Sequence, residues 1–148
     1  MIKNKVYIFG AIFYLSTKIQ NLGDKIFTEI TTKQWFLLIS IVRSGVKNPT
    51  LTQVAKILGY SRQNVKKLSI HLEDVGLLRL KRDETDSRIV RIILTKKCLE
   101  YFESRQEKEE EFIENLYKGI TDEELSKVSN IIKKLEKNIS YLEALGDS

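Results

Sequence analysis

Apolar residues recur at intervals of three and four positions along most of the chain, the spacing of one face of an α-helix. Glycine, proline and helix-capping residues divide this repeat into segments. The segments predict six helices, over residues 5–27, 31–45, 51–58, 61–76, 95–118 and 121–145. The chain is therefore predicted to be mainly helical.

A different pattern separates the fourth predicted helix from the fifth. Leu78–Arg82 and Ile89–Leu94 are short runs rich in β-forming residues, and the segment between them, Asp83–Ser87, is polar. Two such runs joined by a short polar segment predict an antiparallel hairpin. The predicted fold class is mainly α with a small β-hairpin (α+β).

Capping residues support these boundaries. Three helices begin with a threonine followed three residues later by glutamine or glutamate, the capping-box pattern: Thr31–Gln34, Thr50–Gln53 and Thr121–Glu124. Ser61 is a good N-cap for the fourth helix, and Thr95 caps the fifth. Gly45, Gly59 and Gly76 are suited to end the helices before them.

The first and last predicted helices carry long apolar stripes. The first stripe consists of Ile8, Ile12, Leu15, Ile19 and Leu22, widened by Phe9, Phe13 and Tyr14. The last consists of Leu125, Val128, Ile131, Leu135, Ile139, Leu142 and Leu145. Stripes this wide or long need a second apolar surface, and a dimer interface is the preferred interpretation; packing inside a monomer is the alternative.

The remaining helices are expected to pack in two ways. The second should face the core with Trp35, Leu38, Ile39 and Val42. In the fifth, residues 103–111 contain almost no apolar side chains, so this stretch is expected to be a solvated span between two packed ends.

The third and fourth predicted helices, joined at Gly59, have the pattern of a helix-turn-helix. Apolar spacing assigns the core face of the fourth helix to Val65, Leu68, Leu72 and Val75. With successive residues turned by about 100°, Gln63, Lys66, Lys67 and Ile70 point away from that core, and Arg62 is free at the first turn. This outward face is suited to a polyanion.

An arginine lies just after the hairpin turn. Asp86 precedes Arg88 by two residues, and such residues face the same way on an extended segment, so the carboxylate can fix the guanidinium. A rigid arginine at a hairpin tip suits the narrow, negative minor groove of DNA. The alternative is an ordinary surface ion pair, which contributes less than about 1 kcal/mol.

The charge distribution agrees with a nucleic-acid partner. The net charge is +5, and residues 1–60 carry eight basic against two acidic side chains. Residues 61–91 carry eight against five, whereas residues 100–124 carry three against ten. A basic body with an acidic far segment suits a protein that places one surface on a polyanion, although charge runs can also be solvated helix faces.

Composition excludes several other classes. One cysteine and one histidine, Cys98 and His71, cannot form an internal disulfide or a cysteine-based zinc site. The apolar run Val6–Leu15 is too short to span a bilayer. No glycine-rich phosphate loop, nucleophile motif or metal-ligand spacing supports an enzyme, and no cofactor is expected. A single cytoplasmic domain is the expectation.

The segment from Gly76 to Thr95 resembles the wing of the MarR family of bacterial transcriptional regulators. The wing pattern Asp-x-Arg, followed by a hydrophobic strand ending in Leu-Thr, is present as Asp86-Ser87-Arg88 and Ile92-Ile93-Leu94-Thr95. The entry Gly76-Leu77-Leu78 stands at ungapped spacing. Two features depart from the family: a leucine interrupts the basic run Arg79–Arg82, and Cys98 stands where a small residue is expected.

The resemblance implies one MarR-like domain over residues 1–148, with a winged helix-turn-helix over about 31–95 and dimerisation helices over about 5–27 and 96–145. It implies a homodimeric repressor on a pseudo-palindromic double-stranded DNA operator. The major-groove and phosphate contacts would come from Ser61, Arg62, Gln63, Asn64, Lys66 and Lys67, and Arg88 would enter the minor groove, oriented by Asp86. A small aromatic or anionic effector could release DNA, with Phe13, Tyr14 and Trp35 as candidate lining residues.

Two alternatives remain open at this stage. Cys98 stands at a helix start beside Lys96 and Lys97, which would favour a thiolate and a redox-responsive regulator. A winged-helix module that contacts protein or RNA is the other alternative.

Overall fold

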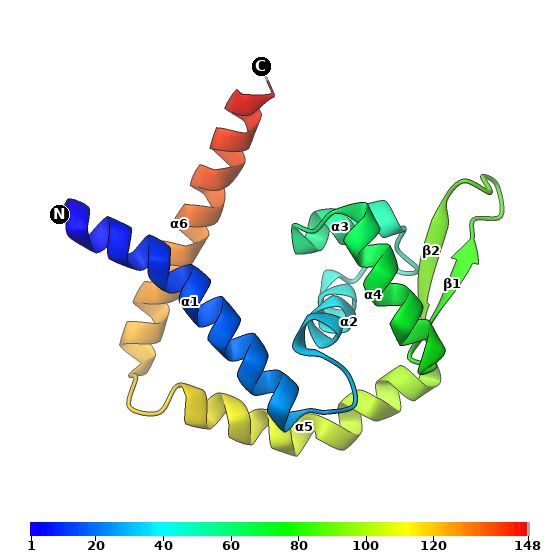
Figure 1. Ribbon diagram of the computed structural model, residues 1–148, viewed down its shortest axis with the longest axis horizontal. Helices are drawn as coiled ribbons and strands as arrows, with labels where there is room; N and C mark the ends of the chain where they lie inside the picture. The colour runs from blue at the N-terminus through cyan, green and yellow to red at the C-terminus, as the bar shows by residue number, and fades with distance from the viewer. Residues whose placement is uncertain (148) are drawn as a thin grey trace. The chain divides into compact units, whose positions relative to one another are not determined.

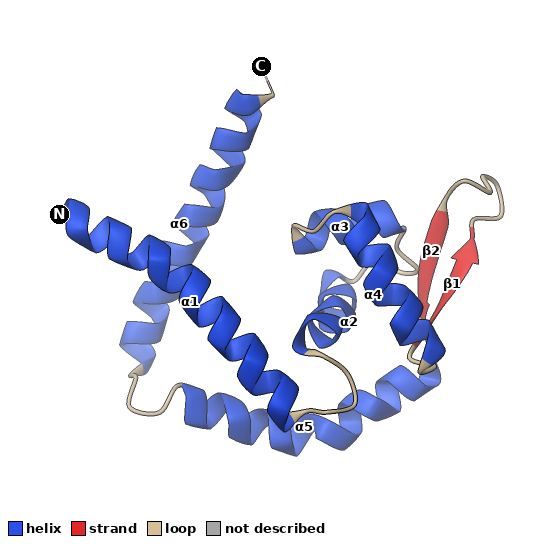
Figure 2. Cartoon of the chain, in the orientation of Figure 1, coloured by secondary structure: helices blue, strands red, loops and turns tan. Residues whose placement is uncertain are grey.

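A computed structural model describes residues 1–147 and contains, over that range, six helices and one two-stranded hairpin (Figure 1, Figure 2). The helices are α1 (Ile2–Ile26), α2 (Thr32–Ser44), α3 (Leu51–Leu58), α4 (Arg62–Asp74), α5 (Lys96–Leu116) and α6 (Asp122–Gly146). The strands are β1 (Leu78–Arg82) and β2 (Val90–Leu94). The predicted fold class is confirmed, and α1 begins three residues earlier than predicted.

Contacts divide the chain into two compact units, residues 1–103 and the part from Ser104 onward. The first unit holds α1 to α4, the hairpin and the start of α5. The second holds the rest of α5 and α6.

The helix starts are formed locally, as their sequence predicts. Thr31, Thr50 and Thr121 each accept a hydrogen bond from the backbone three residues on, and the reciprocal side-chain bond is present in all three. Gly45 and Gly59 adopt left-handed conformations, with φ of 68° and 69°, and end α2 and α3. These short-range bonds explain why the boundaries could be predicted.

The core of the first unit lies between α2, α3, α4 and the hairpin. Its fully buried side chains include Leu37, Leu51, Leu72, Leu78 and Ile92. The core face predicted for α4 is confirmed, with Val65 and Leu72 buried and Leu68 and Val75 packed against them.

The core face predicted for α2 is partly wrong. Leu37, Leu38 and Ile41 are buried, whereas Val42 is exposed and Trp35 and Ile39 are only half-buried. The helix carries apolar residues on nearly every side, so periodicity alone could not orient it. Contacts with α3 and α4 select the face that is buried.

α1 meets α2 at a close backbone approach. The Thr32 side chain donates to the carbonyl of Gln20 at 3.2 Å, and the Thr32 amide donates to Asp24 at 2.6 Å. Gly23 is buried here, and a Cβ at this position would come within 2.3 Å of the Thr32 hydroxyl oxygen. The junction therefore requires glycine at position 23 unless Thr32 shifts.

Most apolar side chains of α1 and α6 are exposed. Those of α1 include Ile8, Ile12, Phe13, Tyr14 and Leu15, and those of α6 include Val128, Ile131, Leu135, Ile139 and Leu142. Gly23 is the buried residue of α1, and none is buried on α6 in the range described. No helix described here, α1 included, has the length and apolar content that crossing a bilayer requires.

The middle of α5 differs from its prediction in one respect. Most of residues 103–111 are exposed, but Arg105 is buried and forms an ion pair with Glu109 one turn later. The predicted solvated span is therefore interrupted by a buried arginine paired with a half-buried glutamate. The stem of an arginine can be buried while its charge is paired, which a count of apolar residues does not detect.

Candidate nucleic-acid interface

The N-terminal end of α4 is a capped helix start with polar side chains around it. The Ser61 hydroxyl accepts from the Asn64 amide at 3.1 Å, so Ser61 is the predicted N-cap. Arg62 and Gln63 are exposed, and Asn64 is half-buried. A helix start with free backbone amides and a hydroxyl is suited to hold a phosphate oxygen.

The outward face of α4 is the predicted one. Gln63, Lys66, Lys67 and Ile70 are all exposed, whereas Val65 and Leu72, on the opposite face of the helix, are buried. Figure 1 shows α4 next to α2 and α3, with the base of the hairpin close to its C-terminal end. The arrangement is a helix-turn-helix whose second helix presents one amide, two amines and one aliphatic side chain to solvent.

The hairpin pairs β1 with β2 antiparallel, with Leu78 opposite Leu94 and Arg82 opposite Val90. Its first strand is attached to α4, because the Glu73 carboxylate accepts from the Leu80 amide at 2.6 Å. The second strand starts at Val90, one residue later than predicted, since the Ile89 amide is used in the turn to bond Asp86.

At the hairpin tip, Asp86 fixes Arg88 as predicted. Nε and Nη2 of Arg88 donate to the two carboxylate oxygens of Asp86, each at 3.0 Å, and the Arg88 amide donates to Oδ1 at 3.0 Å. The arginine side chain is nevertheless 88% exposed. The pair lowers the pKa of Asp86 and raises that of Arg88, mainly through the side-chain hydrogen bonds between them. Arg88 is thus oriented and charged, and its remaining donor edge is accessible.

A further side chain beside the wing, Arg91, connects segments that are remote in sequence. Arg91 donates through Nε to Oδ1 of Asp83 at 2.5 Å and through Nη1 to the backbone carbonyl of Asn48 at 3.0 Å. The pairing of Arg82 with Val90 places the next residue, Asp83, opposite Ile89. Arg91, two residues after Ile89 on the same strand face, is therefore the diagonal neighbour of Asp83. The hairpin register therefore implies the Asp83 contact, whereas the Asn48 contact joins residues that are remote in sequence.

No protein-family model matches the chain. Three similar solved structures are informative. A MarR protein from Peptoclostridium difficile is 25% identical, with a TM-score of 0.78, covering 89% of this chain and 86% of that one. This chain has a MarR-type winged-helix fold. The hairpin is its wing.

The other two structures were solved with a bound partner. FabT from Streptococcus pneumoniae, in complex with DNA, is 20% identical over 93% of this chain and 99% of that one, with a TM-score of 0.66. The organohalide-sensing regulator RdhR, bound to 2,4-dichlorophenol, is 18% identical over 93% of this chain and 81% of that one, with a TM-score of 0.78. At these identities the likeness is one of fold.

The MarR-type fold of this chain buries its cysteine. Cys98 is 0% exposed in the core, and its burial raises the thiol pKa to about 11. This burial does not favour the redox alternative, in which the helix start and Lys96 and Lys97 would stabilise a thiolate. Desolvation outweighs both effects, because the thiol faces the apolar core while the lysines are exposed.

The predicted effector residues stand at separate places in the first unit. Phe13 and Tyr14 are exposed on α1, where Phe13 packs edge-on against Phe9 at 5.2 Å and Lys18 lies 5.5 Å over the Tyr14 ring. Trp35 is half-buried on α2. Phe13 and Tyr14 thus lie on α1 and Trp35 on α2, and the role of the three as a binding site stays a prediction.

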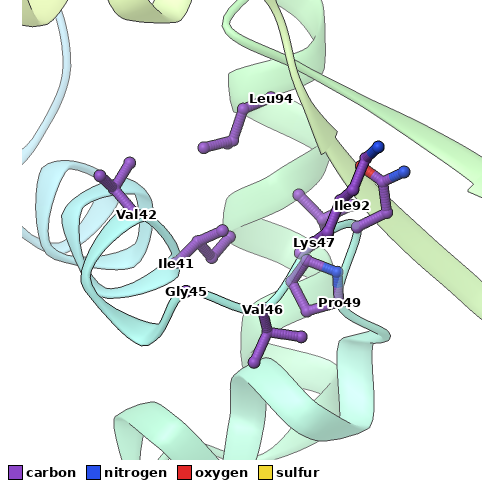
Figure 3. Close-up of a pocket in the computed structure, with 9 residues that line it drawn as sticks. Ile41, Val42, Gly45, Val46, Lys47, Pro49, Ile92 and Leu94 are labelled. Atoms are coloured by element: carbon purple, nitrogen blue, oxygen red, sulfur yellow. The ribbon is translucent and has the colours of Figure 1, made fainter.

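A hollow of about 280 Å³ lies elsewhere in the MarR-type lobe, between the end of α2, the following loop and β2 (Figure 3). Its walls are mainly aliphatic, including Ile41, Val42, Ile92 and Leu94, with Lys47 among the lining residues. None of the three predicted effector residues lines it. Over residues 1–147, no cluster of histidine, cysteine and acidic residues could hold a metal ion.

Proposed function

We propose that this protein is a sequence-specific double-stranded DNA-binding transcriptional regulator, and not an enzyme. The observation that carries the proposal is that one lobe exposes two surfaces suited to DNA. One is the polar face of α4, and the other is Arg88 of the wing, which Asp86 orients. The FabT complex with DNA supports it, because a protein of this fold binds the same class of partner.

In the proposed complex, α4 enters the major groove. Gln63 and Arg62, at the first turn, are able to form bidentate hydrogen bonds with adenine and guanine. Asn64 enters the groove with them, Lys66 and Lys67 supply charge for bases or phosphates, and Ser61 and the backbone amides at the helix start hold phosphate. The side chains that reach base edges specify the sequence, and the phosphate contacts set the register.

Arg88 enters the adjacent minor groove. Its guanidinium is held on one edge by Asp86, so less side-chain freedom is lost on binding. A narrow, A·T-rich minor groove has an enhanced negative potential and attracts such an arginine. The wing therefore contributes both affinity and a preference for groove shape.

The protein acts as a homodimer in this proposal. The exposed apolar side chains of α1 and α6 supply the surface that a second copy would cover. Two-fold symmetry then requires a pseudo-palindromic operator with half-sites about 34–36 Å apart, or a multiple of that spacing. A dimer that covers a promoter in the cytoplasm competes with polymerase, so repression is the proposed outcome.

A small aromatic or anionic effector is a further part of the proposal. The RdhR structure with bound 2,4-dichlorophenol supports it at the level of the fold. Phe13, Tyr14 and Trp35 are the proposed lining residues. Release of DNA requires that the ligand bind the geometry of the free protein better than that of the complex.

Gel-shift titrations on the DNA upstream of the protein's own gene test the proposal. The wild type should bind one fragment with a sequence preference and with affinity that falls steeply with salt. Arg88→Ala should lower this affinity by about 10-fold or more. Arg43→Ala, which removes the same charge from the exposed last turn of α2, is the matched control and should have little effect.

Other outcomes separate the alternative function. If the wild type shows no sequence-preferring, salt-sensitive binding, or if Arg88→Ala equals Arg43→Ala, the proposal fails. Light scattering that finds a monomer with affinity for RNA or protein would favour a winged-helix interaction module instead.

A further inference from the structure

The Arg91 guanidinium joins two loops that are remote in sequence. On one side it bonds the Asp83 carboxylate in the wing turn, and on the other it bonds the Asn48 carbonyl in the loop before α3. Its side chain is 38% exposed and that of Asp83 is 13% exposed, so the pair is partly shielded from water. Arg91 thus connects the wing directly to the helix-turn-helix.

The loop on the Asn48 side is held firmly. Asn48 has a left-handed conformation, φ 49°, which asparagine adopts more readily than most residues. The Ile92 amide donates to the Pro49 carbonyl at 2.8 Å, and Thr50 forms an isolated β-bridge with Arg91. Thr50 is also the N-cap of α3, so Arg91 is anchored to the start of that helix.

On the other side, Asp83 organises the wing turn that carries Arg88. Its second carboxylate oxygen accepts from the Thr85 amide at 3.1 Å, the Thr85 hydroxyl at 2.7 Å and the Asp86 amide at 3.2 Å. Asp86 in turn holds Arg88. A continuous chain of hydrogen bonds therefore runs from the start of α3, through Arg91 and Asp83, to Arg88.

From this geometry we infer that Arg91 is a positioning residue for DNA reading: it fixes the wing tip relative to the helix-turn-helix and so sets where Arg88 stands. The inference rests on the proposed function. α4 and the wing read two grooves at once only if their separation matches the DNA. A wing tip fixed in advance loses less freedom on binding than a mobile one.

The obvious competing role for Arg91 is a direct phosphate contact. The bridging role needs donors in two directions, whereas a phosphate contact needs mainly positive charge. Lysine keeps the charge but lacks the planar, forked donors of arginine. Arg91→Lys and Arg91→Gln therefore distinguish the two roles.

The first test is a double-mutant cycle on operator affinity, with Arg88→Ala, Arg91→Gln and the double variant. If Arg91 acts through Arg88, Arg91→Gln should weaken binding by about 10-fold, and the double variant should be little weaker than Arg88→Ala alone. Arg91→Lys should restore only part of the loss. Arg79→Gln, an exposed charge removal on β1, is the matched control and should leave the Arg88 contribution intact.

Additive losses, or full rescue by Arg91→Lys, would overturn the inference in favour of a phosphate contact. Equal affinity of Arg91→Gln and wild type would also overturn it. Urea unfolding of each variant accompanies the cycle, so that general destabilisation is recognised as a loss independent of Arg88.

A second test uses the free protein and needs no DNA. In Arg91→Gln, amide hydrogen exchange should become faster at Thr85 and Asp86, which bond Asp83 in the wing turn, and at Ile92, which bonds the Pro49 carbonyl. The Leu80 amide, bonded to Glu73 in the same hairpin, should change little. If the wild type binds no operator, the proposed function fails. If hydrogen exchange at these amides is unchanged, the inference that Arg91 fixes the wing turn fails.

Discussion

The helix-turn-helix lobe and the two terminal helices expose opposite kinds of side chain. α4 buries Val65 and Leu72 and exposes Gln63, Lys66 and Lys67, and its start is capped by Ser61. α1 and α6 leave long apolar stripes uncovered. The helix-turn-helix therefore has a buried apolar core and a polar, charged outer face, whereas α1 and α6 expose apolar stripes that an apolar surface could cover. The difference is the one expected if a second copy of the chain covers these stripes, as in the proposed homodimer.

The largest expected effect comes from placing a charge on the uncovered stripe of α6. Ile131→Glu should convert the dimer to monomers, because a carboxylate cannot be buried unpaired in an apolar interface. Operator affinity should then fall by about 100-fold or more, since each half-site is bound alone. Light scattering and gel shifts measure the two effects.

Asn130→Glu, at the adjacent exposed polar position, is the control and should stay dimeric. A wild type that is monomeric at micromolar concentration would contradict the comparison, as would an Ile131→Glu dimer with normal affinity.

Two substitutions on α4 should separate base recognition from electrostatic attraction to phosphates. Gln63→Ala should cost about 1–3 kcal/mol on the preferred operator and relax the preference at one base pair. Lys66→Ala, where it contacts phosphate, should weaken all sequences alike and reduce the salt slope by about 1. Fluorescence anisotropy with single-base operator variants at several salt concentrations measures both. Identical profiles for the two variants would refute a division of roles.

Ile70 tests whether the aliphatic part of the exposed α4 face is used. It is 46% exposed beside Lys66 and Lys67, and an aliphatic group in the major groove packs against a thymine methyl. Replacing thymine by deoxyuridine at one operator position should weaken wild-type binding by about 3- to 5-fold, near one methyl group. Ile70→Ala should lose this sensitivity. Equal responses of the two proteins at every position would exclude the contact.

The stability of the protein at low pH should depend on the pair formed by Asp83 and Arg91. Arg91 and Thr85 hold the pKa of Asp83 well below its usual range, so folding favours the ionised carboxylate. The stability that the pair adds is fully present above the usual carboxyl pKa, near 4, and decreases as the pH falls below it. Asp83→Asn should therefore flatten the loss of stability in urea unfolding below about pH 4. Identical slopes for the two proteins would argue against the shift.

Cys98 should show no effect under oxidation. Its thiol is buried and its pKa is raised to about 11, so the native protein should resist iodoacetamide and peroxide at pH 8. Mass spectrometry follows the modification, with urea-unfolded protein as the reactive control. Native labelling at a rate near that of the unfolded chain would restore the redox alternative.

Features set by neighbouring residues could be predicted from the sequence. The capping boxes, the core face of α4 and the Asp86–Arg88 pair each depend on residues a few positions apart. The wing residues also stood in a recognisable pattern. These elements needed no knowledge of tertiary contacts.

Features set by tertiary packing could not. Arg91 and Asn48 are 43 residues apart, and only the folded hairpin brings them together. The orientation of α2 and the burial of Cys98 likewise depend on which elements cover them. At Cys98 the neighbouring lysines can be read from the sequence, whereas the desolvation of the thiol depends on the fold.

The glycine at the junction of α1 and α2 has a consequence for evolution. A methyl group at position 23 would meet the Thr32 hydroxyl oxygen, so either the Thr32 side chain or the angle between α1 and α2 would have to change. In a dimer held through α1, that angle sets the separation of the two DNA-reading helices. Substitution of Gly23, compensated at Thr32, is thus a route by which a descendant could adopt an operator with a different spacer length while every DNA-contacting residue stays the same.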